Sequence, residues 1–320
     1  MFLMLSSGYL IYVKKQGIFL TQDTVETLKT FAEKGKWESL RLYAQFIMKH
    51  PELGDTVKAR QYLELAETEI HKRKSLIGRI KRFLKGMATG EPEDVESFLG
   101  SLTLDLFLIG DIRDLIIQGF YKPVIKNEKP DVFIAALASI GVATTVYPYV
   151  DIGVSTAKLF KKLKIFSKRF VKILEKIARE SIKTRKFEKL TSIAGDIGKI
   201  TLKTGVAPTA DMVKYVNTAD ELKVLTKSVE KNSVETYGVI ISTDGKALKS
   251  LESGETALEI TDKLRKSSKL SKVLKITRFL KIQYKLLSIL SIPVLAIIFV
   301  LSFILLILTF RGTGRKEYQY

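Results

Sequence analysis

Residues 158–176 read KLFKKLKIFSKRFVKILEK, and the apolar side chains in and just after this stretch recur every three or four positions. They are Leu159, Leu163, Phe166, Phe170, Ile173 or Leu174, and Ile177. This is the period of one face of an α-helix, and Lys and Arg fill the other positions. The stretch predicts a basic amphipathic helix. Such a helix either packs its apolar stripe on the protein's own core or binds an anionic membrane surface, an acidic partner or nucleic acid phosphate.

Positive charge is concentrated in two segments of the 320-residue chain, whose formal net charge is +19. Residues 158–189 hold thirteen Lys or Arg against three Glu, and residues 263–285 hold nine Lys or Arg and no acid. The remainder of the chain is balanced. These two segments therefore carry all of the excess positive charge.

The C-terminal run LLSILSIPVLAIIFVLSFILLILTF, residues 286–310, carries no charge over 25 residues. As one helix it would be about 37 Å long, against a hydrocarbon core of about 30 Å. The run predicts a transmembrane helix at 286–310, with Pro293 tolerated in its first turns.

The segment before that run carries a ring of basic residues, which we expect to contact anionic lipids. Its members are Lys266, Lys269, Lys272, Lys275, Arg278, Lys281 and Lys285. The first six recur every third residue, so they circle a helix, as suits a segment among headgroups. The predicted span makes the protein integral to a membrane, and the positive-inside rule places most of the chain in the cytoplasm and the tail 311–320 outside.

Residues 89–155 predict an apolar helical hairpin with basic flanks. Its first arm, LTLDLFLIGDIRDLIIQGF at 102–120, has a polar cluster in its middle: Asp105, Asp111, Arg113, Asp114 and Gln118. Buried charges cost about 2.5 to 3.5 kcal/mol each in a bilayer, so this arm is not expected to span alone. The second arm, at 132–150, is uncharged for 19 residues. The hairpin could span, lie at the interface or pack internally, and it is the expected surface for a protein partner or a second copy.

Part of this region resembles a known class of sequence. The pattern FLIGDIRDLIIQG, then a charged connector, AALASIGVATT and a basic helix, is similar to the hydrophobic pre-toxin segment of bacterial polymorphic toxins. The resemblance covers roughly residues 98–165. It implies bacterial origin and membrane contact, so the membrane of the predicted span is expected to be the bacterial cytoplasmic membrane. In that family a toxin domain normally follows the segment, whereas here a predicted transmembrane helix follows near the C-terminus.

The fold class expected from these patterns is all-α: a helical membrane protein with short amphipathic helices, an apolar hairpin and a C-terminal transmembrane helix. The expected divisions are an apolar N-terminal segment at 1–20, helical regions at 21–88 and 156–285, and the hairpin between them. Two local predictions are a capped helix ended by Gly35 and a helix capped by Thr218. YGVIIST, at 237–243, is expected to be helical like its neighbours.

Motifs of enzymes and metal sites are missing from the sequence. The chain has no Cys and only two His, and it lacks GxGxxG, GxxxxGK[ST], GxSxG and HExxH. GDIGKIT, which begins at Gly195, has the wrong spacing for a phosphate loop. We therefore expect no enzymatic activity and no cofactor.

Three functions agree with these patterns. The preferred hypothesis is a non-enzymatic scaffold or adaptor whose basic cytoplasmic helices lie beside anionic lipid. The second is a pore-forming or toxin-like protein whose 98–150 hairpin inserts into membranes. The third is a basic module that binds an acidic protein or nucleic acid, although no helix-turn-helix, zinc-finger or RNP pattern supports nucleic acid.

Overall fold

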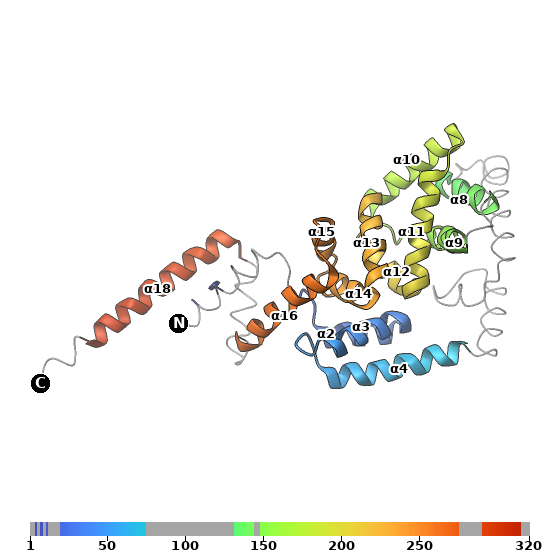
Figure 1. The fold of residues 1–320 in the computed structure, drawn as a ribbon. Helices are drawn as coiled ribbons and strands as arrows, with labels where there is room; N and C mark the ends of the chain where they lie inside the picture. Colours follow the sequence, from blue (N-terminus) through green and yellow to red (C-terminus); the bar gives the residue numbers. More distant parts are fainter. Residues whose placement is uncertain are drawn as a thin grey trace, which may run out of the picture. The chain divides into compact units, whose positions relative to one another are not determined.

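The computed structural model describes residues 20–74, 131–143, 148–274 and 290–314, together with residues 4, 7, 8 and 11. These residues form helices, turns and loops, and no strand occurs among them, which confirms the all-α prediction (Figure 1). The chain divides into two compact units. One unit is continuous, from Asp23 to Ala257. The other combines residues 1–22 with residues 258–320.

The larger unit contains eleven of the described helices. In chain order they are α2 (Thr24–Glu33), α3 (Trp37–Lys49), α4 (Thr56–Lys74), α8 (Val132–Ala143), α9 (Pro148–Lys162), α10 (Lys168–Thr184), α11 (Glu188–Thr204), α12 (Val206–Val213), α13 (Ala219–Lys231), α14 (Ser233–Ser242) and α15 (Ala247–Glu252). Helix α16 (Ala257–Leu274) begins at the boundary and belongs, with α18 (Ile292–Gly314), to the other unit.

Local sequence signals set several helix ends as predicted. Asp23 caps α2 by accepting hydrogen bonds from two backbone N–H groups, and the chain turns after this helix through Gly35, whose φ is 66°. Thr218 accepts a hydrogen bond from the Glu221 N–H and so caps α13. YGVIIST lies in α14 and its C-terminal cap, which confirms the helical expectation.

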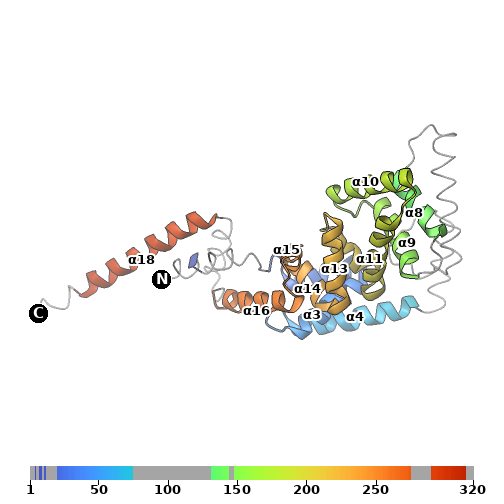
Figure 2. The same cartoon turned by 45° about the horizontal axis from the view of Figure 1, so that its top comes forward.

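Helices α9 and α11 make the most extensive helix pair of the larger unit (Figure 2). Their backbones meet at Gly153 of α9 and Gly198 of α11. A Cβ atom on Gly198 would overlap the carbonyl oxygen of Tyr149, and one on Gly153 would overlap that of Ala194. The GDIG sequence is therefore a helix-crossing element, because its second glycine lets two backbones touch.

The predicted basic helix at 158–176 is wrong in its extent, because the chain breaks it into the end of α9 and the start of α10. Lys164 adopts the left-handed conformation with φ 55°. The N–H of Ile165 then donates to the Phe160 carbonyl and that of Lys164 to the Lys161 carbonyl, the two bonds of a Schellman motif. Ser167 opens α10 by accepting from the Phe170 N–H.

The second arm of the predicted hairpin also divides, since α8 ends at Ala143 and α9 begins at Pro148. Helix α8 packs against α9 and α10, and Phe133, Leu137 and Ile140 are at most 2 % exposed. In this structure the described part of the second arm is thus internal to the larger unit. The first arm, at 102–120, lies outside the described residues.

In the part of the chain that the structure describes, no helix combines the length and the apolar composition needed to cross a membrane. The predictions of a transmembrane helix at 286–310 and of an integral membrane location are therefore wrong. Helix α18 begins only at Ile292, with Pro293 in its first turn, and its uncharged part ends before Arg311. The predicted orientation depended on this span and is withdrawn with it.

Candidate functional site

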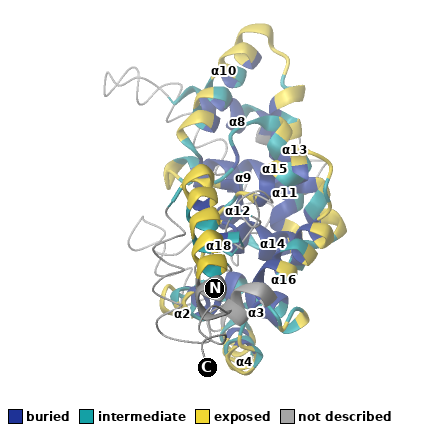
Figure 3. Ribbon diagram, turned by 90° about the vertical axis from the view of Figure 1, so that its left-hand side faces the viewer, coloured by how far each residue is buried: buried dark blue, intermediate teal, exposed yellow. Residues whose placement is uncertain are grey.

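Helix α10 has two faces of opposite chemistry, and Figure 3 shows its mixture of buried and exposed residues. Phe170, Leu174, Ala178 and Ser181 are buried against the larger unit. Six basic residues are exposed on the other side, and we call them the cationic face: Lys168, Arg169, Lys172, Lys176, Arg179 and Lys183. The sequence left open whether the apolar stripe packs on the protein's own core or binds a partner or membrane. In the structure it packs on the protein's own core.

The cationic face is narrow and long. At about 100° per residue, its six positions fall within a sector of about 100°, centred opposite the buried stripe. From Lys168 to Lys183 the row extends about 22 Å. Glu175 and Glu180 lie just outside the sector, and Glu175 is paired with Lys161 at 2.5 Å. No carboxylate therefore interrupts the row.

An aromatic cluster holds α10 in place. Phe166, in the connector before α10, makes edge contacts with Phe133 of α8, Phe160 of α9 and Phe170 of α10, at centroid distances of 6.5, 5.8 and 5.5 Å. The Ser167 hydroxyl also donates to the Val216 carbonyl oxygen at 2.8 Å. These contacts fix the direction in which the six cations point.

Further exposed cations extend the surface at both ends of α10. Lys162 and Lys164 precede the helix, and Arg185, Lys186 and Lys189 follow it. An exposed apolar side chain lies near each end: Leu163 is 42 % exposed and Ile182 is 44 % exposed. The cationic face and these flanking residues together form a strongly cationic surface with two exposed apolar side chains.

The site residues named from the sequence are only partly within the described chain. Asp105, Asp111, Arg113, Asp114 and Gln118 lie outside the described residues, as do Lys275, Arg278, Lys281 and Lys285. Lys266 is exposed on α16. Lys269 and Lys272 belong to the same helix by their backbone. The structure therefore leaves both predicted clusters as predictions.

The cationic face itself was not among the residues named from the sequence. Its signal was present in the spacing of Lys168, Lys172, Lys176, Arg179 and Lys183, which advance by three or four residues. The basic stripe lies opposite the apolar stripe that the sequence pattern predicted.

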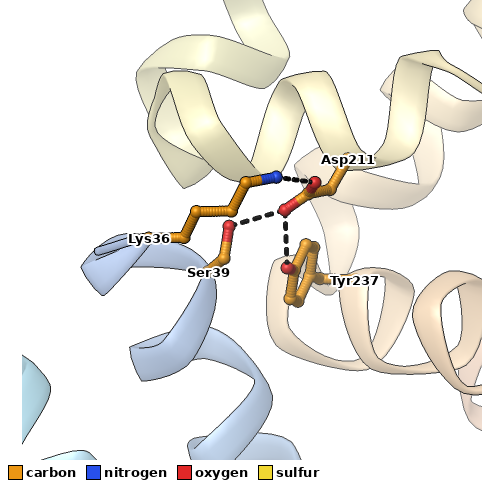
Figure 4. A network of polar contacts seen from close by, with 4 residues as sticks. All are labelled: Lys36, Ser39, Asp211 and Tyr237. Carbon is orange, nitrogen blue, oxygen red and sulfur yellow. Dashed lines mark hydrogen bonds and ion pairs between the residues drawn. The ribbon is translucent and has the colours of Figure 1, made fainter. Parts of the chain in front are cut away.

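A second group of polar side chains lies buried between α3, α12 and α14 (Figure 4). Asp211 accepts hydrogen bonds from the Lys36 ammonium at 2.5 Å, the Ser39 hydroxyl at 2.8 Å and the Tyr237 hydroxyl at 3.3 Å. Burial, followed by the charge of Asp211, raises the pKa of Tyr237 well above its usual range, so its hydroxyl stays a donor. Asp211 is 4 % exposed, and both of its carboxylate oxygens accept hydrogen bonds. We interpret this network as structural.

Within the described residues no group of three or more His, Asp or Glu side chains is placed to hold a metal ion. Comparisons with protein-family models, curated proteins and solved structures found no match to this chain. The resemblance to pre-toxin segments therefore stays a prediction.

Proposed function

We propose that this protein is a binding module that docks on an anionic lipid surface through the cationic face of α10. The observation that carries the proposal is the uninterrupted row of six exposed cations opposite the buried stripe. Near an anionic membrane each basic residue contributes about 1 kcal/mol, so the row supplies on the order of 6 kcal/mol. That is enough for docking driven by charge, without a spanning helix.

Two features favour lipid over nucleic acid. The row contains four Lys and two Arg and no aromatic side chain, whereas proteins that bind single strands stack bases on aromatic rings. Leu163 and Ile182 are exposed near the ends of the row, where they could enter the interfacial region while neighbouring lysines stay among headgroups.

Neutralising half of the row is the first test. The variant Lys172→Gln/Lys176→Gln/Arg179→Gln should bind vesicles of phosphatidylcholine with 30 % phosphatidylserine about a hundredfold more weakly than the wild type, if each cation contributes about 1 kcal/mol. Binding of the full chain is measured by vesicle co-sedimentation at fixed ionic strength. Wild-type binding should also weaken as salt is raised, because the contact is between exposed charges.

The matched control removes the same charge elsewhere. Lys203, Lys231 and Lys249 are exposed on α11, α13 and α15, so Lys203→Gln/Lys231→Gln/Lys249→Gln should bind almost as the wild type does. Both variants keep the basic residues of 263–285, so a difference between them reports α10. Equal losses in the two variants would show that only net charge matters, and undiminished binding to pure phosphatidylcholine would contradict the proposal. Binding of duplex DNA, without lipid binding, would support the third hypothesis instead.

A further inference from the structure

An open cleft of about 530 Å³ lies between the start of α9 and one face of α11. Tyr149 and Phe187 supply aromatic rings, and Thr191, Ser192 and Asp196 supply polar groups from successive turns of α11. Gly195 lies between them, and a Cβ there would come within 3.4 Å of the Tyr149 ring. The volume is within the range of small-molecule sites, about 300 to 1,000 Å³.

The carboxylate of Asp196 is the unusual group in this cleft. Among the described residues it makes no hydrogen bond or ion pair, although Lys199 is near enough to lower its pKa. Lys199 is instead paired with Glu230 at 3.3 Å. Burial outweighs the nearby lysines and raises the pKa of Asp196. An anion in this position gains from any cation that reaches it.

The lining carries two carboxylates and one basic residue, Lys199, which is paired with Glu230 outside the lining. Glu188 adds a second carboxylate, which would repel an anion from the cleft. Aromatic rings attract organic cations through their π faces, by about 0.5 to 2 kcal/mol. Carboxylate and ring together form the usual surroundings of an ammonium or guanidinium group, and they occur here on a protein that is otherwise strongly basic.

We propose that the cleft binds a small organic cation, an ammonium or guanidinium group joined to an apolar body, with Asp196 as the counter-charge and Tyr149 as an aromatic wall. This proposal does not rest on lipid docking, because none of the residues that line the cleft belongs to the cationic face of α10.

The test uses two probes of equal shape and different charge. Benzylamine is a cation at pH 7.5, and benzyl alcohol is its neutral counterpart. Ligand-observed NMR titrations of the full chain should show benzylamine bound at least tenfold more tightly than benzyl alcohol. Asp196→Asn should abolish that preference, whereas Asp220→Asn, at an exposed position on α13, should keep it. Equal binding of the two probes, or equal behaviour of the two variants, would overturn the proposal.

A second variant separates the ring from the charge. Tyr149→Leu keeps an apolar wall but removes the π face, and it should weaken benzylamine about threefold while leaving benzyl alcohol nearly unchanged. Loss of both probes in parallel would mean that Tyr149 only shapes the cleft and would remove it from the proposed site. Circular dichroism of each variant confirms that the fold is retained.

The same carboxylate predicts a pH-dependent stability difference. Because the folded-state pKa of Asp196 lies above its unfolded value of 3.8, the folded state takes up the proton first as pH falls. The charged group therefore costs stability at neutral pH, and that cost disappears as pH drops through the folded pKa to about 3.8. Without ligand, Asp196→Asn should melt at a higher temperature than wild type at pH 7, and the two melting temperatures should converge near pH 4.

Scanning fluorimetry across this pH range measures the effect. Asp220→Asn is again the control and should track the wild type at every pH. A melting temperature of Asp196→Asn below that of wild type at pH 7 would show that the lysines around Asp196 already compensate its charge. Asp196 would then not be an uncompensated counter-charge, and the proposal would be overturned.

Discussion

Gly198→Ala should lower the free energy of unfolding by roughly 3 kcal/mol or more. The added methyl group would overlap the carbonyl oxygen of Tyr149, which belongs to the backbone of α9 and cannot rotate away. Helices α9 and α11 would have to separate along the most extensive contact of the larger unit. Gly153→Ala should have a similar effect, since its methyl group would overlap the carbonyl oxygen of Ala194.

Gly195→Ala provides the matched control on the same helix. Its added carbon would lie 3.4 Å from the nearest atom, in the Tyr149 ring, which is ordinary contact. Ala is favoured over Gly inside a helix by about 1 kcal/mol, so this variant should be as stable as the wild type or more so. Urea unfolding followed by circular dichroism compares the three variants. If Gly198→Ala and Gly195→Ala unfold at the same urea concentration, the helices do not cross as described.

Local signals in the sequence predicted the helical class and several helix ends. Thr218, for instance, lies just before ADELKVLTKSVEK, and its hydroxyl caps that helix in the structure. Such ends are predictable because the capping group and the groups it satisfies are neighbours in the chain. The apolar stripe of α10 was predictable as well, because Phe170 and Leu174 recur at the helical period and are buried.

The break before α10 depended on contacts that sequence periodicity does not contain. The 158–176 pattern continues in phase through the turn, so it predicted one helix. The chain instead places Phe166 among three other phenylalanines, and Lys164 adopts a left-handed conformation to allow it. That conformation costs a non-glycine residue about 1 to 2 kcal/mol, which the aromatic packing offsets. Leu163, predicted on the apolar stripe, is 42 % exposed as a result.

The wrong membrane prediction came from equating an uncharged run with a helix of the same length. The run 286–310 is uncharged throughout, but α18 uses only its later part. Pro293 could have indicated this, because proline has no N–H and is favoured in the first turn of a helix. Composition therefore predicted the apolarity of this segment correctly and its helical length wrongly.

The two proposed sites differ in how much of each could be predicted from the sequence alone. The cationic face is a repeat along one helix and could be traced from spacing alone. The cleft brings Tyr149 of α9 beside Asp196 of α11 through a glycine crossing, and no local pattern connects these residues. The Asp211 network joins residues as far apart as 175 positions, so it also required the fold.

Asp211→Ala should destabilise the protein by roughly 3 to 5 kcal/mol, because each buried hydroxyl that loses its acceptor costs about 1 to 3 kcal/mol. The change removes the acceptor shared by the Ser39 and Tyr237 hydroxyls, which are buried and would lose their hydrogen bonds. It also removes the partner of Lys36, although that side chain is 35 % exposed and can turn to water. Most of the loss should therefore come from the two hydroxyls and from the space left by the carboxylate.

Two further variants separate these contributions in urea unfolding experiments. Asp211→Asn keeps the shape and one carbonyl acceptor, so it should lose less than Asp211→Ala. Glu33→Ala removes one partner of an exposed ion pair with Lys29, whose charged atoms are 3.7 Å apart, and should change stability by no more than about 0.5 kcal/mol. If Asp211→Ala were as mild as Glu33→Ala, the junction of α3 with α12 and α14 would be held by apolar packing alone. The larger loss would instead show that a single buried carboxylate fixes how these three helices meet.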